Sequence, residues 1–97
     1  MTIARLYRLE AAEGKAAELE AALTVLAGRV RQLSGCRGVE VLRVSDNDSL
    51  FTLIEKWDSI EAHKSGAKAL GREAAAAMVA ALAGAPQGSY LEYVLAN

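Results

Sequence analysis

Hydrophobic and polar residues alternate along four short segments of the chain. This period of two is typical of β-strands that bury one face. The segments span residues 2–10, 38–45, 50–57 and 89–96. A polar stretch at residues 46–49 separates the second segment from the third and predicts a hairpin turn between them.

Between the first two predicted strands the pattern changes to a helical period. From Lys15 onward, large apolar residues recur every three or four positions, which predicts a helix with one buried side. These residues are Leu19, Leu23, Leu26, Val30 and Leu33. Ser34 and Gly35 follow, and because glycine suits a left-handed helix end, we expect the helix to stop there.

A second helical region lies between the third and fourth predicted strands. Asp58, with Glu61 three residues later, resembles a capping box and should begin a short helix. Gly66 and Gly71 weaken this region, so we expect a break and then a longer helix to about Ala83. Alanine dominates that longer helix, which leaves room either for a snug core or for a cavity.

The order of the predicted elements is β-α-β-β-α-β. This order is typical of the α+β ferredoxin-like fold, in which helices cover one face of a four-stranded antiparallel sheet. Ninety-seven residues are enough for one hydrophobic core but not for two. We therefore expect a single domain over residues 1–97.

The predicted strands are apolar on both faces, as Leu53 and Ile54 illustrate in the third. Two helices can cover only one face, so the other would expose more apolar surface than monomers usually tolerate. A second copy stacking sheet on sheet would cover it, and we therefore expect a homodimer. The alternative is a monomer whose apolar open face also carries Arg5, Arg43 and Glu55.

The charge balance excludes some classes of partner. Eleven basic and twelve acidic residues give a net charge of −1, and without a basic block we expect neither nucleic acid nor a membrane as partner. The first five residues lack the apolar run of a signal peptide, and the longest apolar run, 74–83, is about half of what spans a bilayer. A single cysteine, Cys36, allows no internal disulfide. These features favour the cytoplasm.

Three short motifs follow one another along the chain. Gly14-Lys15 opens the first predicted helix, Gly35-Cys36 turns into the second strand, and Glu55-Lys56-Trp57 closes the third. In this order and spacing they resemble the antibiotic biosynthesis monooxygenase (ABM) domain family. The resemblance implies a dimeric α+β barrel. Among characterised relatives it implies cofactor-independent oxidation of polycyclic phenols or quinols to quinones by O2, although others degrade haem or have no known enzymatic role.

The chain departs from the family pattern at two places. Many members carry a histidine nine residues after the tryptophan, where this chain has Gly66, and its only histidine, His63, lies one helical turn earlier. Haem-degrading relatives use an asparagine on the first strand, and residues 2–10 contain none. The second departure argues against haem, and the first leaves open whether His63 faces the same cavity.

Trp57 and His63 are the candidate catalytic residues. Trp57 could form a flat wall for an aromatic substrate and donate a hydrogen bond to its oxygen, or it could simply pack beneath a helix. His63 has a near-neutral reference pKa, which suits accepting a phenolic proton. The alternative is a solvent-exposed histidine beside Lys64.

Several further residues are candidates for substrate binding: Tyr7, Tyr93, Arg5, Arg43 and Glu55, with Tyr90 as a third tyrosine. Arg5 shares a face with Tyr7, Arg43 could join them, and an arginine there could stabilise a phenolate. Glu55 shares a face with Trp57 and would need Arg5 or Arg43 as partner if buried. Packing with the hydroxyl at the rim is the commoner role of strand tyrosines.

Other kinds of chemistry find little support. Cys36 lies beside Arg37, a cation that lowers a thiol pKa, but no histidine adjoins it in sequence to activate it. One histidine and one distant cysteine do not form the usual closed metal site, so no metal is expected. The glycines form no G-x-G-x-x-G loop for a nucleotide, and no cofactor is expected.

The sequence therefore favours a homodimeric, cofactor-independent monooxygenase acting on a phenol or quinol in an apolar cavity. The rival is a non-catalytic dimer that binds a small apolar ligand or serves a partner enzyme. Isomerase or lyase chemistry on a small carbonyl compound is a third reading, and it too needs a positioned base. A cavity lined by Trp57 and an ionisable group would favour catalysis, whereas one filled by leucine and alanine would favour the rival.

Overall fold

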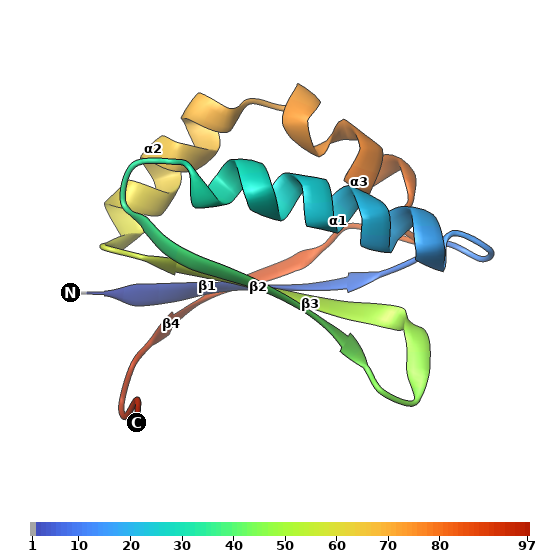
Figure 1. Ribbon diagram of the computed structural model, residues 1–97, viewed down its shortest axis with the longest axis horizontal. Coiled ribbons are helices and arrows are strands. Elements are labelled where there is room, and N and C mark those ends of the chain that lie inside the picture. The colour runs from blue at the N-terminus through green and yellow to red at the C-terminus, as the bar shows by residue number, and fades with distance from the viewer. Residues whose placement is uncertain (1) are drawn as a thin grey trace.

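The computed structural model describes residues 2–97 and contains one four-stranded antiparallel sheet. The strands are β1 (Ile3–Glu10), β2 (Cys36–Val44), β3 (Asn47–Trp57) and β4 (Gln87–Glu92), in the spatial order β2-β3-β1-β4. The helices are α1 (Ala16–Arg31), α2 (Ile60–Leu70), the 3₁₀ turn η1 (Glu73–Ala75) and α3 (Ala76–Ala80). All of them lie over one face of the sheet (Figure 1). The predicted ferredoxin-like β-α-β-β-α-β fold is confirmed.

The core lies between the helices and the sheet and has two halves. Helix α1 crosses both, because the predicted apolar residues that lie within it, Leu19, Leu23, Leu26 and Val30, are all buried. Leu33 lies beyond the helix end and is partly buried. In one half, Leu19 and Leu23 pack against Phe51 of β3. In the other, Leu26 and Val30 pack in a cluster with Trp57. The alternation of β3 therefore sends Phe51 and Trp57 to the helix side, as their period of two predicts.

The hairpin between β2 and β3 is tighter than predicted. Val44 pairs with Asn47, so the turn consists of residues 45 and 46 alone. The Asn47 side chain accepts a hydrogen bond from the amide of Ser49 at 3.1 Å. Residues 47–49 are polar but extended, because a two-residue turn lets the antiparallel ladder begin at once.

Helix α2 begins one residue later than predicted. Its N-cap is Ser59, whose hydroxyl accepts a hydrogen bond from the amide of Ala62 at 3.0 Å. Asp58 is engaged elsewhere, because Arg37 donates two hydrogen bonds to its carboxylate at 2.6 and 2.9 Å. The ion pair with Arg37 thus removes Asp58 from the capping position, and serine takes the role.

The helical region after Trp57 also divides differently from the prediction. Helix α2 continues through Gly66 and ends only at Gly71, whose φ of 80° is a conformation that glycine adopts freely. The second helix is the shorter one, since α3 has five residues. Gly66 does not break the helix because it packs on the ring of Trp57, and tertiary contact outweighs its low helix propensity.

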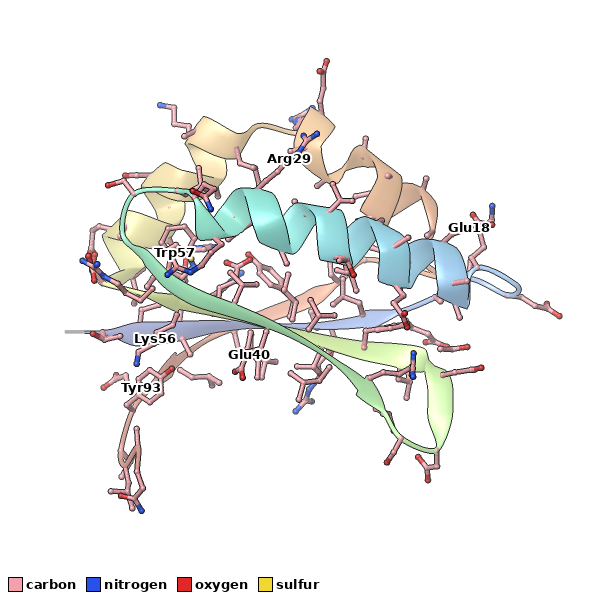
Figure 2. The ribbon with its side chains drawn as sticks, viewed as in Figure 1. Glu18, Arg29, Glu40, Lys56, Trp57 and Tyr93 are labelled. Carbon is pink, nitrogen blue, oxygen red and sulfur yellow. The ribbon has the colours of Figure 1, made fainter. Side chains whose placement is uncertain are left out.

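Strand β4 ends at Glu92 rather than at residue 96. Glu92 pairs with Ile3, the first residue of β1, so β1 has no further residue with which β4 could pair. Tyr93 lies beyond the ladder, on the side of the sheet away from the helices (Figure 2). Glu40 and Lys56 also project from that open face, whereas Trp57 lies among the helices.

The open face carries apolar side chains as well as charged ones. Leu42 and Leu91 are 48% and 42% exposed. Their register partners Thr52 and Ala4 project to the same side. Arg5 and Glu55, in contrast, project to the helix side, so the expectation that they lie scattered over the open face is wrong. Among residues 2–97, no helix is both long and apolar enough to cross a membrane.

Candidate active site

His63 lies in the second turn of α2 and faces the sheet. The Ser59 cap fixes the start of the helix, and the amide of His63 donates to the Ser59 carbonyl at 3.2 Å. Only 7% of His63 is exposed. The alternative of a solvent-exposed histidine beside Lys64 is therefore wrong.

Two tyrosines hold the imidazole from opposite sides. The hydroxyl of Tyr7 lies 3.0 Å from Nε2 of His63, and the hydroxyl of Tyr90 lies 2.7 Å from Nδ1. A neutral imidazole has one N–H and one lone pair. It therefore donates to one tyrosine and accepts from the other, so three side chains from β1, α2 and β4 form one chain of hydrogen bonds.

Glu55 and Trp57 form the next part of the site, two residues apart on β3. The indole Nε1–H of Trp57 donates to Oε1 of Glu55 at 2.9 Å, and both residues are buried, with 1% and 4% exposed. The same Oε1 lies 3.8 Å from Nε2 of His63. The indole N–H is therefore occupied by Glu55, which corrects the expectation that it is free to bind a substrate oxygen.

Arg5 lies beneath the tyrosines. Its guanidinium carbon is 4.8 Å from the ring centre of Tyr7 and 4.2 Å from that of Tyr90. Register explains the contact, because Arg5 pairs with Tyr90 on β4 and with Glu55 on β3. Within residues 2–97, its buried Nε has no hydrogen-bond partner. The predicted neighbourhood of Arg5 and Tyr7 is confirmed, and the arginine supplies positive charge to the site.

Burial sets the proton affinities of this cluster. The pKa of His63 is lowered, first by burial and then by the positive charges of Arg5 and Lys64. Burial raises the pKa of Glu55, outweighing the Trp57 hydrogen bond and the charge of Arg5 that favour the carboxylate. Burial likewise raises the pKa of Tyr7. At neutral pH the imidazole is therefore uncharged and free to accept a proton.

The lowered pKa of His63 can be measured directly. His63 is the only histidine, so its ring protons give one assignable pair of NMR signals. We expect their titration midpoint below the ordinary value of about 6.5, because burial and two cations disfavour the imidazolium. Lys64→Gln should raise the midpoint by removing one of those cations. A midpoint at or above 6.5 in the unmodified protein would contradict this description of the site.

A cavity of about 160 Å³ opens between the helices and the sheet, next to this cluster. Tyr7, His63, Glu55 and Trp57 all contribute to its wall. The rest of the wall is apolar and comes from all three helices, β1, β3 and the segment before β4. His63 thus faces this cavity, although it lies one helical turn before the family position.

Two of the predicted binding residues lie away from this cluster. Arg43, near the end of the edge strand β2, forms an ion pair with Glu20 of α1 and is half exposed. Tyr93 stacks under the ammonium group of Lys56 at 5.3 Å, on the open face. Neither residue lines the cavity. The expectation that Arg43 joins Arg5 and Tyr7 is wrong, and Tyr93 lies on the opposite face of the sheet from the cluster.

Tyr90 takes the place that the sequence assigned to Tyr93. The alternation of the last strand correctly separates residues 90 and 93 onto opposite faces, but it does not say which face meets the helices. The pairing of Arg5 with Tyr90 would have identified the right tyrosine, and a single sequence does not contain that register.

The Cys36 thiol and the possible metal-binding side chains form no second reactive site among the described residues. Cys36 is buried, and burial raises the pKa of its thiol, while the neighbouring Arg37 is directed to Asp58. Burial therefore outweighs the modest lowering of the thiol pKa that a neighbouring arginine would give. Among the described residues, no three histidine, cysteine, aspartate or glutamate side chains gather closely enough to hold a metal ion.

The fold and the buried site define a small ferredoxin-like α+β protein with an apolar cavity beside a histidine. The family model for antibiotic biosynthesis monooxygenase matches residues 2–81. The chain therefore belongs to the antibiotic biosynthesis monooxygenase family, as its three motifs predict, and this membership supports a general monooxygenase-type role. No curated protein matches the sequence significantly.

Solved structures resemble the chain over almost its full length. A proposed antibiotic biosynthesis monooxygenase from Caulobacter crescentus is 29% identical, with a TM-score of 0.80 over 97% of this chain and 91% of that one. A second, from Bordetella bronchiseptica, is 21% identical, with a TM-score of 0.84 over 97% and 98%. SnoaB, a cofactor-independent oxygenase from Streptomyces nogalater, is 17% identical, with a TM-score of 0.83 over 98% and 95%. At such identities the last two support the fold alone.

Proposed function

We propose that residues 1–97 act as one ABM-like domain, a cofactor-independent monooxygenase that oxidises a phenol or quinol to a quinone with O2. The observation that carries the proposal is the imidazole of His63, held between the hydroxyls of Tyr7 and Tyr90 at the wall of an apolar cavity. Trp57 forms the adjoining wall, and its T-shaped contact with His63, at 5.5 Å between ring centres, fixes the imidazole plane.

The first step is removal of the phenolic proton. With the imidazole proton on Nδ1, His63 donates to Tyr90 and accepts from the hydroxyl of Tyr7 on Nε2. A substrate hydroxyl donating to the Tyr7 oxygen then loses its proton to Tyr7 as Tyr7 passes its own to Nε2. Glu55, 3.8 Å from Nε2, faces the positive charge that arrives there, and Arg5 stabilises negative charge on the tyrosine during the transfer.

The second step is the reaction of the phenolate with O2, for which the substrate supplies the electrons. The ring carbon para to the oxygen forms a C–O bond to dioxygen, and the resulting peroxide takes up a proton. The hydrogen on that carbon then leaves as a proton, its electron pair forms the new C=O bond, and the O–O bond breaks to release water. Phenol plus O2 thus gives quinone plus water, and the apolar cavity keeps bulk water from the intermediate.

The residues that line the cavity favour a monooxygenase over a non-catalytic ligand carrier. A carrier would fill or line the space with leucine and alanine alone, whereas this wall includes Trp57 and the ionisable side chains of Tyr7, His63 and Glu55. Perturbed pKa values beside a cavity are typical of functional sites. No specific observation favours isomerase or lyase chemistry.

Oxygen uptake tests the proposal. Purified protein is incubated aerobically with simple phenols and naphthols in an oxygen electrode while quinone absorbance is followed. We expect one O2 consumed per quinone formed, at a rate proportional to the protein. Uptake no faster than that of protein lacking both Trp57 and His63 side chains (Trp57→Ala, His63→Ala) would refute the function.

We propose further that the protein is a homodimer joined through the open face of the sheet. The exposed Leu42 and Leu91 on that face support this, since apolar patches of this kind mark interfaces. Leu91→Lys should therefore lower the sedimentation coefficient at micromolar concentration to that of a monomer. Val25→Lys, at a more exposed apolar position on α1, should leave the coefficient unchanged. A monomer in the unmodified protein would rule the dimer out.

The cytoplasm remains the proposed location. The single cysteine, Cys36, is an unpaired thiol, which suits a reducing compartment. Fractionation of cells that express a tagged chain tests this, and recovery from an exported fraction would contradict it.

A further inference from the structure

The cavity is polar at one end only. Its polar atoms follow one another in a chain: the Trp57 indole N–H lies 2.9 Å from Oε1 of Glu55, that oxygen 3.8 Å from Nε2 of His63, and Nε2 3.0 Å from the Tyr7 hydroxyl. Every other lining side chain is apolar, as Leu9, Leu26, Leu53, Leu70, Met78 and Pro86 illustrate. A ligand therefore meets hydrogen-bonding groups on one side alone.

No cation lines the cavity among the described residues. Arg5 lies against the rings of Tyr7 and Tyr90 and is not part of the wall. Glu55, in contrast, is part of it. A carboxylate or sulfate on the ligand would be buried without a partner and near an acidic group, so an uncharged ligand fits best.

The volume limits the ligand to one ring. A designed apolar cavity of roughly 150 Å³ holds benzene, and this cavity measures about 160 Å³. Pockets for drug-sized ligands usually begin near 300 Å³. A single aromatic ring with a small alkyl group therefore fits, whereas three fused rings do not.

We propose that the substrate of this site is a monohydric, single-ring phenol with a small alkyl substituent and a free para position, not a hydroquinone or a polycyclic phenol. This rests on the proposed function and narrows it. The lone hydroxyl occupies the polar end against Tyr7. A second hydroxyl in the para position would be buried among leucine and methionine side chains without a partner, which weakens binding roughly tenfold to a hundredfold.

The reaction is balanced for such a substrate. With 2-ethylphenol, one O2 gives 2-ethyl-1,4-benzoquinone and one water: the para carbon loses its hydrogen and gains an oxygen, and the second oxygen atom leaves as water. The new carbonyl then lies at the apolar end, where no lining group donates a hydrogen bond. The product therefore binds less well than the substrate, which favours its release.

A matched pair of ligands tests the proposal without turnover. Under anaerobic conditions, 2-ethylphenol and 2-ethylbenzene-1,4-diol, which differ only by the para hydroxyl, are titrated into the unmodified protein by calorimetry. Fluorescence of the sole tryptophan, Trp57, reports whether each ligand enters the cavity. A third titration uses 9-phenanthrol as the three-ring probe.

We expect the monohydric phenol to bind at least tenfold more tightly than the diol, and the three-ring phenol to leave Trp57 fluorescence unchanged. Equal or tighter binding of the diol, entry of the three-ring phenol, or binding of neither single-ring ligand overturns the proposal. Because these measurements exclude O2, they are independent of the oxygen-uptake test. A protein that prefers 2-ethylphenol yet consumes no oxygen would refute the function and keep the selectivity.

Discussion

His63→Ala is expected to lower the rate of oxygen uptake by a factor of roughly 10² to 10⁴, the usual contribution of a positioned general base. The imidazole is the one group in the cavity wall that is uncharged at neutral pH and still able to accept a proton. Without it, the hydroxyl of Tyr7 has no acceptor for its proton. Burial raises the pKa of Tyr7, so the hydroxyl keeps that proton and cannot take the substrate's in exchange.

His63→Gln separates proton transfer from positioning. A glutamine side chain can still exchange hydrogen bonds with tyrosine hydroxyls, but it does not titrate. We therefore expect nearly the same loss of activity as with alanine. Lys68→Ala, at an exposed position of the same helix, serves as the control and should keep the full rate. If His63→Gln keeps the activity of the unmodified protein, His63 positions the tyrosines and is not the base.

The sequence predicts the architecture well because local patterns determine it. The period of two identifies all four strands, and the apolar stripe of α1 is buried as its spacing predicts. Apart from the shorter second helix α3, the errors lie at element ends, where long-range contacts decide. Arg37 draws Asp58 away from the helix cap, and β1 ends before β4 could extend to residue 96.

The site is predicted only in part, because its assembly depends on register between strands. Alternation along one strand predicts which of its side chains are neighbours on the same face. Arg5 is therefore correctly placed near Tyr7, and Glu55 near Trp57. Alternation does not predict the contacts between residues of different strands. Whether Tyr90 or Tyr93 meets His63 depends on which face the helices cover, and a single sequence does not state it.

The role of Gly66 in the fold differs most from what the sequence alone suggests. Read locally, a glycine in a helix is a weakness, and Gly66 and Gly71 together predict a break, which occurs only at Gly71. In the fold, a Cβ at this position would lie 2.5 Å from Cη2 and 2.8 Å from Cζ3 of Trp57. Many family members are expected to carry a histidine here, and in this chain the ring of Trp57 takes up that space. The histidine one turn earlier lines the cavity.

Gly66→Ala should therefore destabilise the protein, although alanine is the better helix former. Helix propensity alone favours alanine by about 0.5–1 kcal/mol. Overpacking a well-packed core typically costs about 1–3 kcal/mol, and a contact of 2.5 Å against a rigid indole forces Trp57 to move. Displacement of Trp57 also disturbs its hydrogen bond to Glu55, so the emission of this sole tryptophan should shift to the red.

Gly28→Ala is the matched control, because Gly28 lies in α1 and a Cβ there meets nothing within 4 Å. Both substitutions gain the same helix propensity, so the difference between their free energies of unfolding isolates the contact with Trp57. Denaturant unfolding should give Gly66→Ala about 1–3 kcal/mol less stability than Gly28→Ala, with changed fluorescence only in the former. Equal stabilities and unchanged emission for both variants would mean that α2 and Trp57 are not packed as closely as the structure has them. In that case α2 and Trp57 would not form the cavity wall in the way described here.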